Sequence, residues 1–211
     1  MQPSAWPQLD HCLGGGWLAG EWHELMGAGF GVGEFSVLLP LLASATARKA
    51  RVALIHPPYV PYAPALCAAG ITLGDVIVIE PKTSQAACWA AEHCLRALNG
   101  GVVVVWTQET QLLGDVTLRR LRKAAQVGRC TGIALRPARA ENCPSPAGVR
   151  LRYESTHEGI ALTCVKRRYN AYETQRVETT AHIALPLLNT QPEKLPLFLH
   201  SALAAVVASV K

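Results

Sequence analysis

Residues 27–36 read GAGFGVGEFS and contain four glycines at alternate positions: Gly27, Gly29, Gly31 and Gly33. Such a density of glycine between a short strand and a helix is typical of a phosphate-binding loop, whose backbone N–H groups surround phosphate oxygens. The working loop reads G-x-x-x-x-G-K-[ST], in which the lysine neutralises charge and the hydroxyl holds magnesium. Here the last glycine comes one residue late, and Glu34 and Phe35 stand where lysine and Ser/Thr belong. The pattern therefore predicts a degenerate phosphate loop.

The charges near this loop argue against nucleotide binding. A carboxylate at Glu34 repels a triphosphate, and Ser36 alone leaves several negative charges uncompensated. A nucleotide-hydrolysing protein of this type also places an acidic magnesium ligand at the end of a central strand. The strongest strand candidate here, GVVVVW, runs through Trp106 to Gln108 before Glu109 appears. Glu34 and Glu109 could form an acid/base pair or be two solvated carboxylates, and we favour the second interpretation. We expect no ATP hydrolysis, no catalytic residue, no cofactor and no metal ion.

Apolar strand patterns and helical patterns alternate along the chain. Strands are predicted at 21–26, 51–56, 76–80, 101–106 and 131–136, and helices at 34–49, 63–69, 84–98 and 117–127. This alternation predicts an α/β fold with a mainly parallel central sheet and helices on both of its faces. Residues 149–154 and 159–166 alternate in polarity around a short turn, which predicts a β-hairpin added at the sheet edge.

We expect one core domain with an appendage at each end. Residues 1–20 are rich in Pro, Gly and Trp without a sustained period, and they are interpreted as an N-terminal strap. Residues 21–169 would form the core. Residues 170–211 would form an irregular tail that ends in an apolar segment from Leu195 to Val210, amphipathic enough to pack on the core or on a partner.

Composition indicates a compact domain in a reducing compartment. Half of the 211 residues are hydrophobic and 17% are charged, which is sufficient for a buried core. A net charge of +5 permits an acidic partner but falls short of a dedicated DNA-binding domain. The seven cysteines are scattered and lack C-x-x-C spacing, so we interpret them as buried apolar side chains. The sequence shows no membrane-spanning run, and we expect a cytoplasmic protein.

Several segments together carry a resemblance to a known family. They are, in order, HELMG before the glycine loop, EFSVLLPLL after it, HPPYVPYAPALCAAGI, CWAAEHCLRAL, GVVVVW, LRRLRKAAQVG, GIALRP and CVKRR. Over residues 9–169 the chain resembles the ImuA family of RecA-like accessory proteins in bacterial mutagenic translesion DNA synthesis. The resemblance implies a RecA-like P-loop-type core and a place in the SOS response to DNA damage. It also implies RecA and an ImuB-type polymerase-family protein as partners, and no ATPase activity.

The SulA family of SOS cell-division inhibitors offers the alternative. Similarity to it spans residues 35–137, and it would imply binding to the tubulin-like division protein. Such inhibitors lack a recognisable counterpart of residues 6–33, so the complete N-terminal part favours the first family.

The resemblance to RecA also implies candidate partner-binding residues. RecA carries two lysines, two positions apart, on a late strand that reaches the nucleotide of a neighbouring subunit. The segment LTCVKRRYNAY matches that strand and places Lys166 and Arg168 at those positions, with Arg167 between them. A solvated strand end is the other interpretation of these charges. We also expect partner contacts from the apolar tail, at Leu195, Leu197, Phe198 and Leu199.

Other basic and aromatic residues are weaker candidates. Arg136 and Arg139 begin a segment at the position of the DNA-contacting loop of RecA-like proteins, but this segment has no aromatic residue for base stacking, so single-stranded DNA would be bound weakly or indirectly. The basic face of helix 117–127 is interpreted as solvated. Tyr59 and Tyr62 lie in a proline-rich loop after a strand and are candidates for partner contact.

Overall fold

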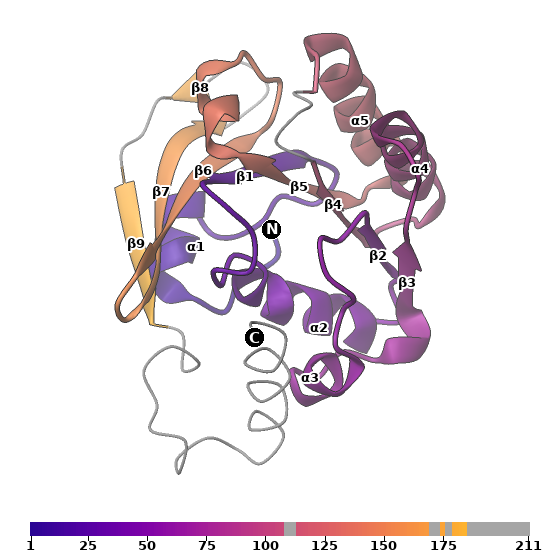
Figure 1. Cartoon of the computed structure of the whole chain (residues 1–211), viewed down its shortest axis with the longest axis horizontal. Coiled ribbons are helices and arrows are strands. Elements are labelled where there is room, and N and C mark those ends of the chain that lie inside the picture. Colours follow the sequence, from indigo (N-terminus) through magenta and orange to yellow (C-terminus); the bar gives the residue numbers. More distant parts are fainter. Residues whose placement is uncertain (108–112, 169–173, 176–178, 185–211) are drawn as a thin grey trace, which may run out of the picture.

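The computed structural model of the chain describes residues 1–107, 113–168, 174–175 and 179–184. Its strands are β1 (Trp22–Gly27), β2 (Val52–Ile55), β3 (Val76–Ile79), β4 (Val102–Trp106), β5 (Thr131–Pro137), β6 (Val149–Thr156), β7 (Gly159–Arg168), β8 (Thr174–Gln175) and β9 (Thr179–Ala184). Its α-helices are α1 (Pro7–Leu13), α2 (Leu39–Ala47), α3 (Ala63–Ala68), α4 (Ser84–Ala97) and α5 (Asp115–Gly128). Three 3₁₀ turns, η1 (Ser36–Leu38), η2 (Leu73–Asp75) and η3 (Ala138–Asn142), complete the described elements. Figure 1 shows their arrangement.

One sheet joins all of these strands in the order β3-β2-β4-β5-β1-β6-β7-β8, with β9 also paired to β7. The first six run parallel, whereas β7 is antiparallel to β6, β8 and β9. The expected α/β fold with a mainly parallel sheet is therefore confirmed. The expected hairpin is formed by β6 and β7, but it is not the sheet edge, because β8 and β9 extend the sheet beyond it.

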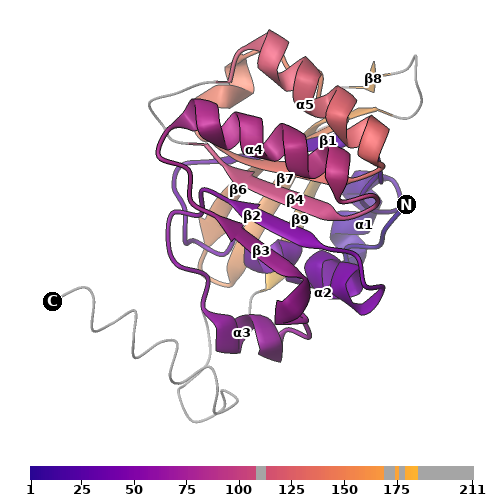
Figure 2. The same ribbon diagram turned by 90° about the vertical axis from the view of Figure 1, so that its right-hand side faces the viewer.

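Helices cover both faces of the sheet, because alternate residues of each strand point to opposite sides. In β4, Val102, Val104 and Trp106 belong to the core on the face covered by α1 and α2. Val103 and Val105 belong to the core on the other face, which α4 and α5 cover. Figure 2 shows α4 and α5 together on one side of the sheet.

Local sequence signals explain where most helices begin. The Thr83 side chain accepts a hydrogen bond from the Ala86 amide at 3.1 Å and caps α4. The expected helix over 34–49 is shorter, because Pro40 has no N–H to donate and therefore sits in the first turn of α2, after the turn η1. The helix expected over 117–127 begins earlier, at Asp115.

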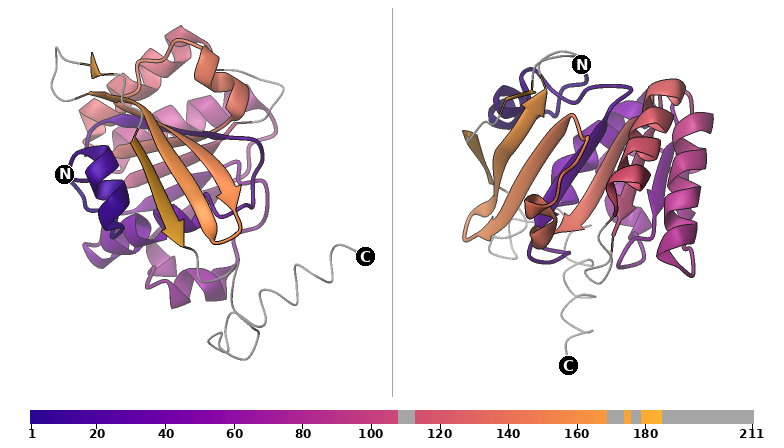
Figure 3. Two further views of the ribbon diagram at one scale, coloured as in Figure 1. Left: turned by 90° about the vertical axis from the view of Figure 1, so that its left-hand side faces the viewer. Right: turned by 90° about the horizontal axis from the view of Figure 1, so that it is seen from above.

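The N-terminal segment is more ordered than the expected strap. It contains α1, whose Leu9, Cys12 and Leu13 are buried, and Trp17 is fully buried after it. Helix α1 contacts β7 and β9, the strand that was not expected in the tail (Figure 3). The N-terminal helix thus packs against the strand that the tail adds to the sheet. The rest of the tail, including Leu195–Val210, lies outside the described residues.

The cysteines were expected to be buried, and the structure confirms this for only some of them. Cys12, Cys130 and Cys164 are buried, three others are half-buried, and Cys67 on α3 is exposed, so the expectation is wrong for Cys67. Within the described ranges, no helix is both long and apolar enough to cross a bilayer.

A buried ion cluster joins three neighbouring strands. Glu24 on β1 is fully buried, and its carboxylate accepts hydrogen bonds from Arg136 Nη1 on β5 at 2.7 Å and from Arg150 Nε on β6 at 2.8 Å. Ser145 Oγ donates to the same carboxylate at 2.7 Å, and Arg150 Nη2 also donates to the Ala140 carbonyl at 2.6 Å. Two cations and one anion are thus desolvated together, and each depends on the others for compensation.

Replacing Glu24 should therefore destabilise the fold severely. A Glu24→Gln variant leaves two buried guanidinium groups without a counter-ion, so we expect the free energy of unfolding in urea to fall by about 3–5 kcal/mol. The matched control is Glu154→Gln, since Glu154 pairs with Arg152 at 3.3 Å at the surface. The control should change stability by less than about 0.5 kcal/mol. Equal losses in the two variants would contradict the assigned importance of the cluster.

Candidate functional site

The glycine loop follows β1 and bends sharply at positions that favour glycine. Gly31 and Gly33 have φ values of 82° and 104°, a region that side chains with a Cβ rarely adopt. Gly27 is required for a different reason, because a Cβ at this position would overlap the ring of Tyr153 on β6. The loop thus turns at Gly31 and Gly33 before η1 begins.

Glu34 closes this loop from within. Its carboxylate accepts hydrogen bonds from the amides of Gly31 and Val32, each at 2.9 Å, and the residue is only 2% exposed. The interpretation of Glu34 as a solvated carboxylate is therefore wrong. Backbone amides in such a nest are the groups that a phosphate would bind. In this chain an internal carboxylate already accepts their hydrogen bonds.

Two aromatic rings stand where the phosphate-loop pattern of the sequence would place magnesium ligands. Phe35 replaces the hydroxyl residue of the loop, and Trp106 ends the central strand β4. Their ring centroids are 5.4 Å apart with a 51° angle between planes. Apolar contact fills this space without offering oxygen ligands. The next residue, Thr107, donates its hydroxyl to the Leu135 carbonyl at 3.2 Å, and Glu109 lies outside the described residues.

Tyr153 holds the loop from the side of β6. Its hydroxyl donates to the Gly29 carbonyl at 2.6 Å, and its ring lies against Gly27. Burial, together with the negative charge of Glu34, raises the pKa of the Tyr153 phenol well above its ordinary value. The phenol therefore remains a neutral hydrogen-bond donor in the folded protein.

The basic residues at the end of β7 point to two sides of the sheet. Lys166 donates from Nζ to the Ser145 carbonyl at 2.6 Å, and Arg168 Nη1 lies 3.7 Å from a Glu21 carboxylate oxygen. Arg167 points the other way and donates to the carbonyls of His11 and Cys12 at the end of α1. Burial, and then the positive charge of Arg150, lower the pKa of Lys166.

These contacts differ from a freely solvated strand end. Lys166 and Arg168 share one side and remain partly exposed, whereas Arg167 serves to attach α1. The last four candidates of the tail, from Leu195 to Leu199, lie outside the described residues.

The two arginines proposed for DNA contact, Arg136 and Arg139, differ in burial. Arg136 is fully buried in its ion pair with Glu24, so its expected exposure to DNA is wrong for this conformation. Arg139 is exposed. The basic face of α5 is partly neutralised, because Arg119 pairs with Asp115 at 2.8 Å and Arg122 with Glu21 at 2.6 Å.

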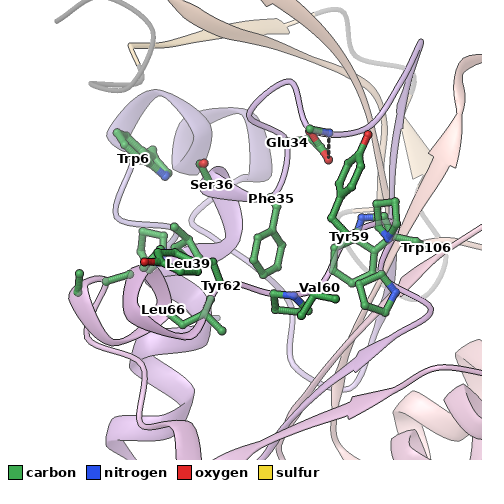
Figure 4. A pocket seen from close by; sticks show the side chains of 18 residues that line it. Trp6, Glu34, Phe35, Ser36, Leu39, Tyr59, Val60, Tyr62, Leu66 and Trp106 are labelled. Atoms are coloured by element: carbon green, nitrogen blue, oxygen red, sulfur yellow. Dashed lines mark hydrogen bonds between the residues drawn. The ribbon is translucent and has the colours of Figure 1, made fainter. Parts of the chain in front are cut away.

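An apolar groove lies beside the loop. Its volume is about 620 Å³, and it lies between the loop after β1, the proline-rich loop after β2, and α3. Figure 4 shows its labelled aromatic and aliphatic side chains, among them Trp6, Phe35, Tyr59, Tyr62 and Trp106. We call this feature the apolar groove. It includes both tyrosines that the sequence indicated as candidates for partner contact.

Comparisons with known proteins add no relative. The chain matches no protein-family model and none of the curated proteins. In the part of the chain that the structure describes, no three His, Cys, Asp or Glu side chains are grouped so that they could hold a metal ion.

Sequence reasoning missed the residues that act across long separations. Tyr153 contacts a loop more than a hundred residues earlier in the chain, and only the register of β6 against β1 brings them together. Trp6 in the supposed strap lines the apolar groove and donates from Nε1 to the Val37 carbonyl at 3.3 Å. No local spacing in the sequence predicts either contact.

Removing the Glu34 carboxylate should open the loop. In a Glu34→Ala variant the amides of Gly31 and Val32 lose their acceptor, so we expect their hydrogen exchange, measured by NMR, to accelerate at least about tenfold. The free energy of unfolding should fall by about 1–3 kcal/mol. The control is Glu158→Ala, an exposed carboxylate in the turn between β6 and β7. Unchanged exchange at Gly31 and Val32 would contradict the assigned hydrogen bonds.

Tyr153 should make stability fall at alkaline pH. The pKa of its phenol is raised in the folded protein, so only the unfolded chain ionises this group at moderately alkaline pH. The free energy of unfolding is therefore unaffected by Tyr153 below the ordinary pKa of about 10, and it falls as the pH rises above that value. At pH 11 this loss should be about 1.4 kcal/mol. A Tyr153→Phe variant should lack that part of the fall between pH 8 and pH 11, measured by urea unfolding at both values. Parallel pH profiles for the two proteins would contradict the assignment.

Proposed function

We propose that this chain is a non-catalytic accessory protein of SOS mutagenesis, with a RecA-like core and a cytoplasmic location. It would link RecA to an ImuB-type partner and an error-prone polymerase in translesion DNA synthesis. The proposed pathway and partners rest on the family resemblance. The proposed absence of catalysis rests on the chemistry of the glycine loop.

The Glu34 carboxylate is the single observation that carries the non-catalytic part of the proposal. Its two oxygens accept hydrogen bonds from the amides of Gly31 and Val32 at 2.9 Å. In a phosphate-binding loop such amides would donate to a phosphate. A triphosphate would have to displace a carboxylate held by two hydrogen bonds and then compensate its own charge without a loop lysine. A protein with this loop is suited to binding other macromolecules rather than to turning over ATP.

Lys166 and Arg168 support the proposed docking on RecA. They lie on the same side of β7 and are both partly exposed, which is the arrangement that the resemblance requires of two cations that reach a neighbouring subunit. Within the protein their contacts are the Ser145 carbonyl and the Glu21 carboxylate. Docking would replace these acceptors with phosphate oxygens of the nucleotide bound by RecA.

The N-terminal part favours the ImuA-type function over the SulA-type alternative. Strand β1 lies in the middle of the sheet between β5 and β6, and α1 covers part of one face. These elements belong to residues 6–33, which recognisable SulA-type inhibitors lack. The two functions still differ in a measurable way, because they require different partners.

Sedimentation with RecA filaments tests the proposal. The full chain should co-sediment with RecA on single-stranded DNA in the presence of ATP. A Lys166→Gln/Arg168→Gln variant should bind at least about tenfold more weakly, because it loses two charged contacts to the partner's nucleotide. Glutamine is used rather than glutamate because Lys166 and Arg168 contact the Ser145 carbonyl and the Glu21 carboxylate. A glutamine amide can still donate to these oxygens, whereas a glutamate would repel them.

The matched control removes two cations elsewhere. Arg48 and Lys49 are exposed beside the end of α2, so Arg48→Gln/Lys49→Gln lowers the net charge equally and should leave RecA binding unchanged. Equal weakening in both variants would indicate a non-specific charge effect. Absence of wild-type binding, with binding to the tubulin-like division protein instead, would replace the proposal with the SulA-type function.

A further inference from the structure

The apolar groove exposes large side chains that a folded protein ordinarily covers. Tyr59 is 69% exposed, Val60 83% and Tyr62 43%, and all three lie on the same proline-rich loop (Figure 4). Among the described residues that line the groove, Glu34 alone is charged, and both of its carboxylate oxygens already accept hydrogen bonds from the loop. The groove therefore fits an uncharged, apolar occupant.

The tail of this chain has the required chemistry. Its last apolar segment repeats large and small apolar residues at helical spacing: Leu195, Phe198, Leu199, Ala202, Leu203, Val206, Val207 and Val210. Pro196 stands where a proline is tolerated at the start of a helix. The opposite side of this pattern carries Leu197, Ser201, Ala204 and Ala208. The sequence thus predicts a helix whose apolar face carries the large aliphatic and aromatic side chains of the segment except Leu197.

The topology brings the start of this tail to the correct edge of the sheet. Strand β9 is antiparallel to β7, and β7 is antiparallel to β6, so β9 runs in the same direction as the parallel strands. Its last residue, Ala184, pairs with Gly159 at the edge where the parallel strands end. The groove lies at this same edge, because its loops follow the carboxyl ends of β1, β2 and β4.

The connecting residues are long enough to reach the groove. From β9 to β1 the sheet order crosses three strand spacings, and from β9 to β2 it crosses six. At about 4.8 Å each, these distances are roughly 14 Å and 29 Å. Residues 185–194 can span up to about 33–36 Å when extended. The segment that begins at Leu195 can therefore lie along the whole groove.

We infer that residues 195–210 of this chain bind the apolar groove of the same molecule. The apolar face of the segment contacts Tyr59, Val60 and Tyr62, and the tether raises its effective concentration at the groove to the millimolar range. This intramolecular contact covers the groove when no partner is present. A partner that uses Leu199 or its neighbours must first displace the segment. The inference does not depend on the proposed function, because it requires no other protein.

NMR of the full-length chain tests the inference. Nuclear Overhauser effects are expected between methyl groups of Leu199 or Leu203 and the rings of Tyr59 or Tyr62, with intensities that do not change on dilution. A Leu203→Glu variant should lose these effects and shift the ring resonances, since the charge falls on the apolar face. The control Ser201→Glu adds the same charge to the opposite face and should keep them.

Two results would overturn the inference. Effects between isotope-labelled and unlabelled chains in a mixed sample would assign the groove to the tail of a second copy. Absence of the effects in the wild-type chain, with ring resonances identical to those of Leu203→Glu, would show that residues 195–210 do not bind the groove. Neither result bears on RecA binding, so failure here is distinguishable from failure of the proposed function.

Discussion

The tight glycine loop depends on an acceptor for its backbone amides, and Glu34 supplies that acceptor from within the chain. Amides that converge in a nest attract an anion, and without one they would be left with unfavourable desolvation. The hydrogen bonds at 2.9 Å to Gly31 and Val32 satisfy this requirement without a ligand. The neighbouring aromatic residues add no competing ligand, because Phe35 and Trp106 place apolar surface beside the loop. One carboxylate of the chain thus satisfies the amides of the loop.

The same strand that enters the loop carries a second buried carboxylate. Glu24 joins β1 to β5 and β6 through Arg136 and Arg150, while Tyr153, three residues after Arg150, contacts the loop. The loop and the ion cluster are therefore supported by the same pair of neighbouring strands. Because buried charges tolerate little displacement, this pair is suited to holding the loop in one conformation.

Sequence periodicity predicted the α/β fold because buried parallel strands such as 102–106 leave an unbroken apolar run. The glycine spacing also located the loop, and the proline-rich segment after a strand predicted that Tyr59 and Tyr62 would be exposed. The direction of the Glu34 side chain was not predictable, since a carboxylate beside a loop can face solvent or the loop's own amides. Arg136 was misassigned because its ion pair depends on Glu24, which lies over a hundred residues away. Helix α1 was missed because its seven residues are too few to establish a period.

Calorimetric titration of the full-length chain with MgATP tests most directly whether its own carboxylate occupies the loop. The occupied loop predicts no saturable heat up to about 1 mM nucleotide, a concentration at which weak specific sites are still detected. Saturable binding with a micromolar dissociation constant would show that a nucleotide displaces Glu34, and it would contradict the account.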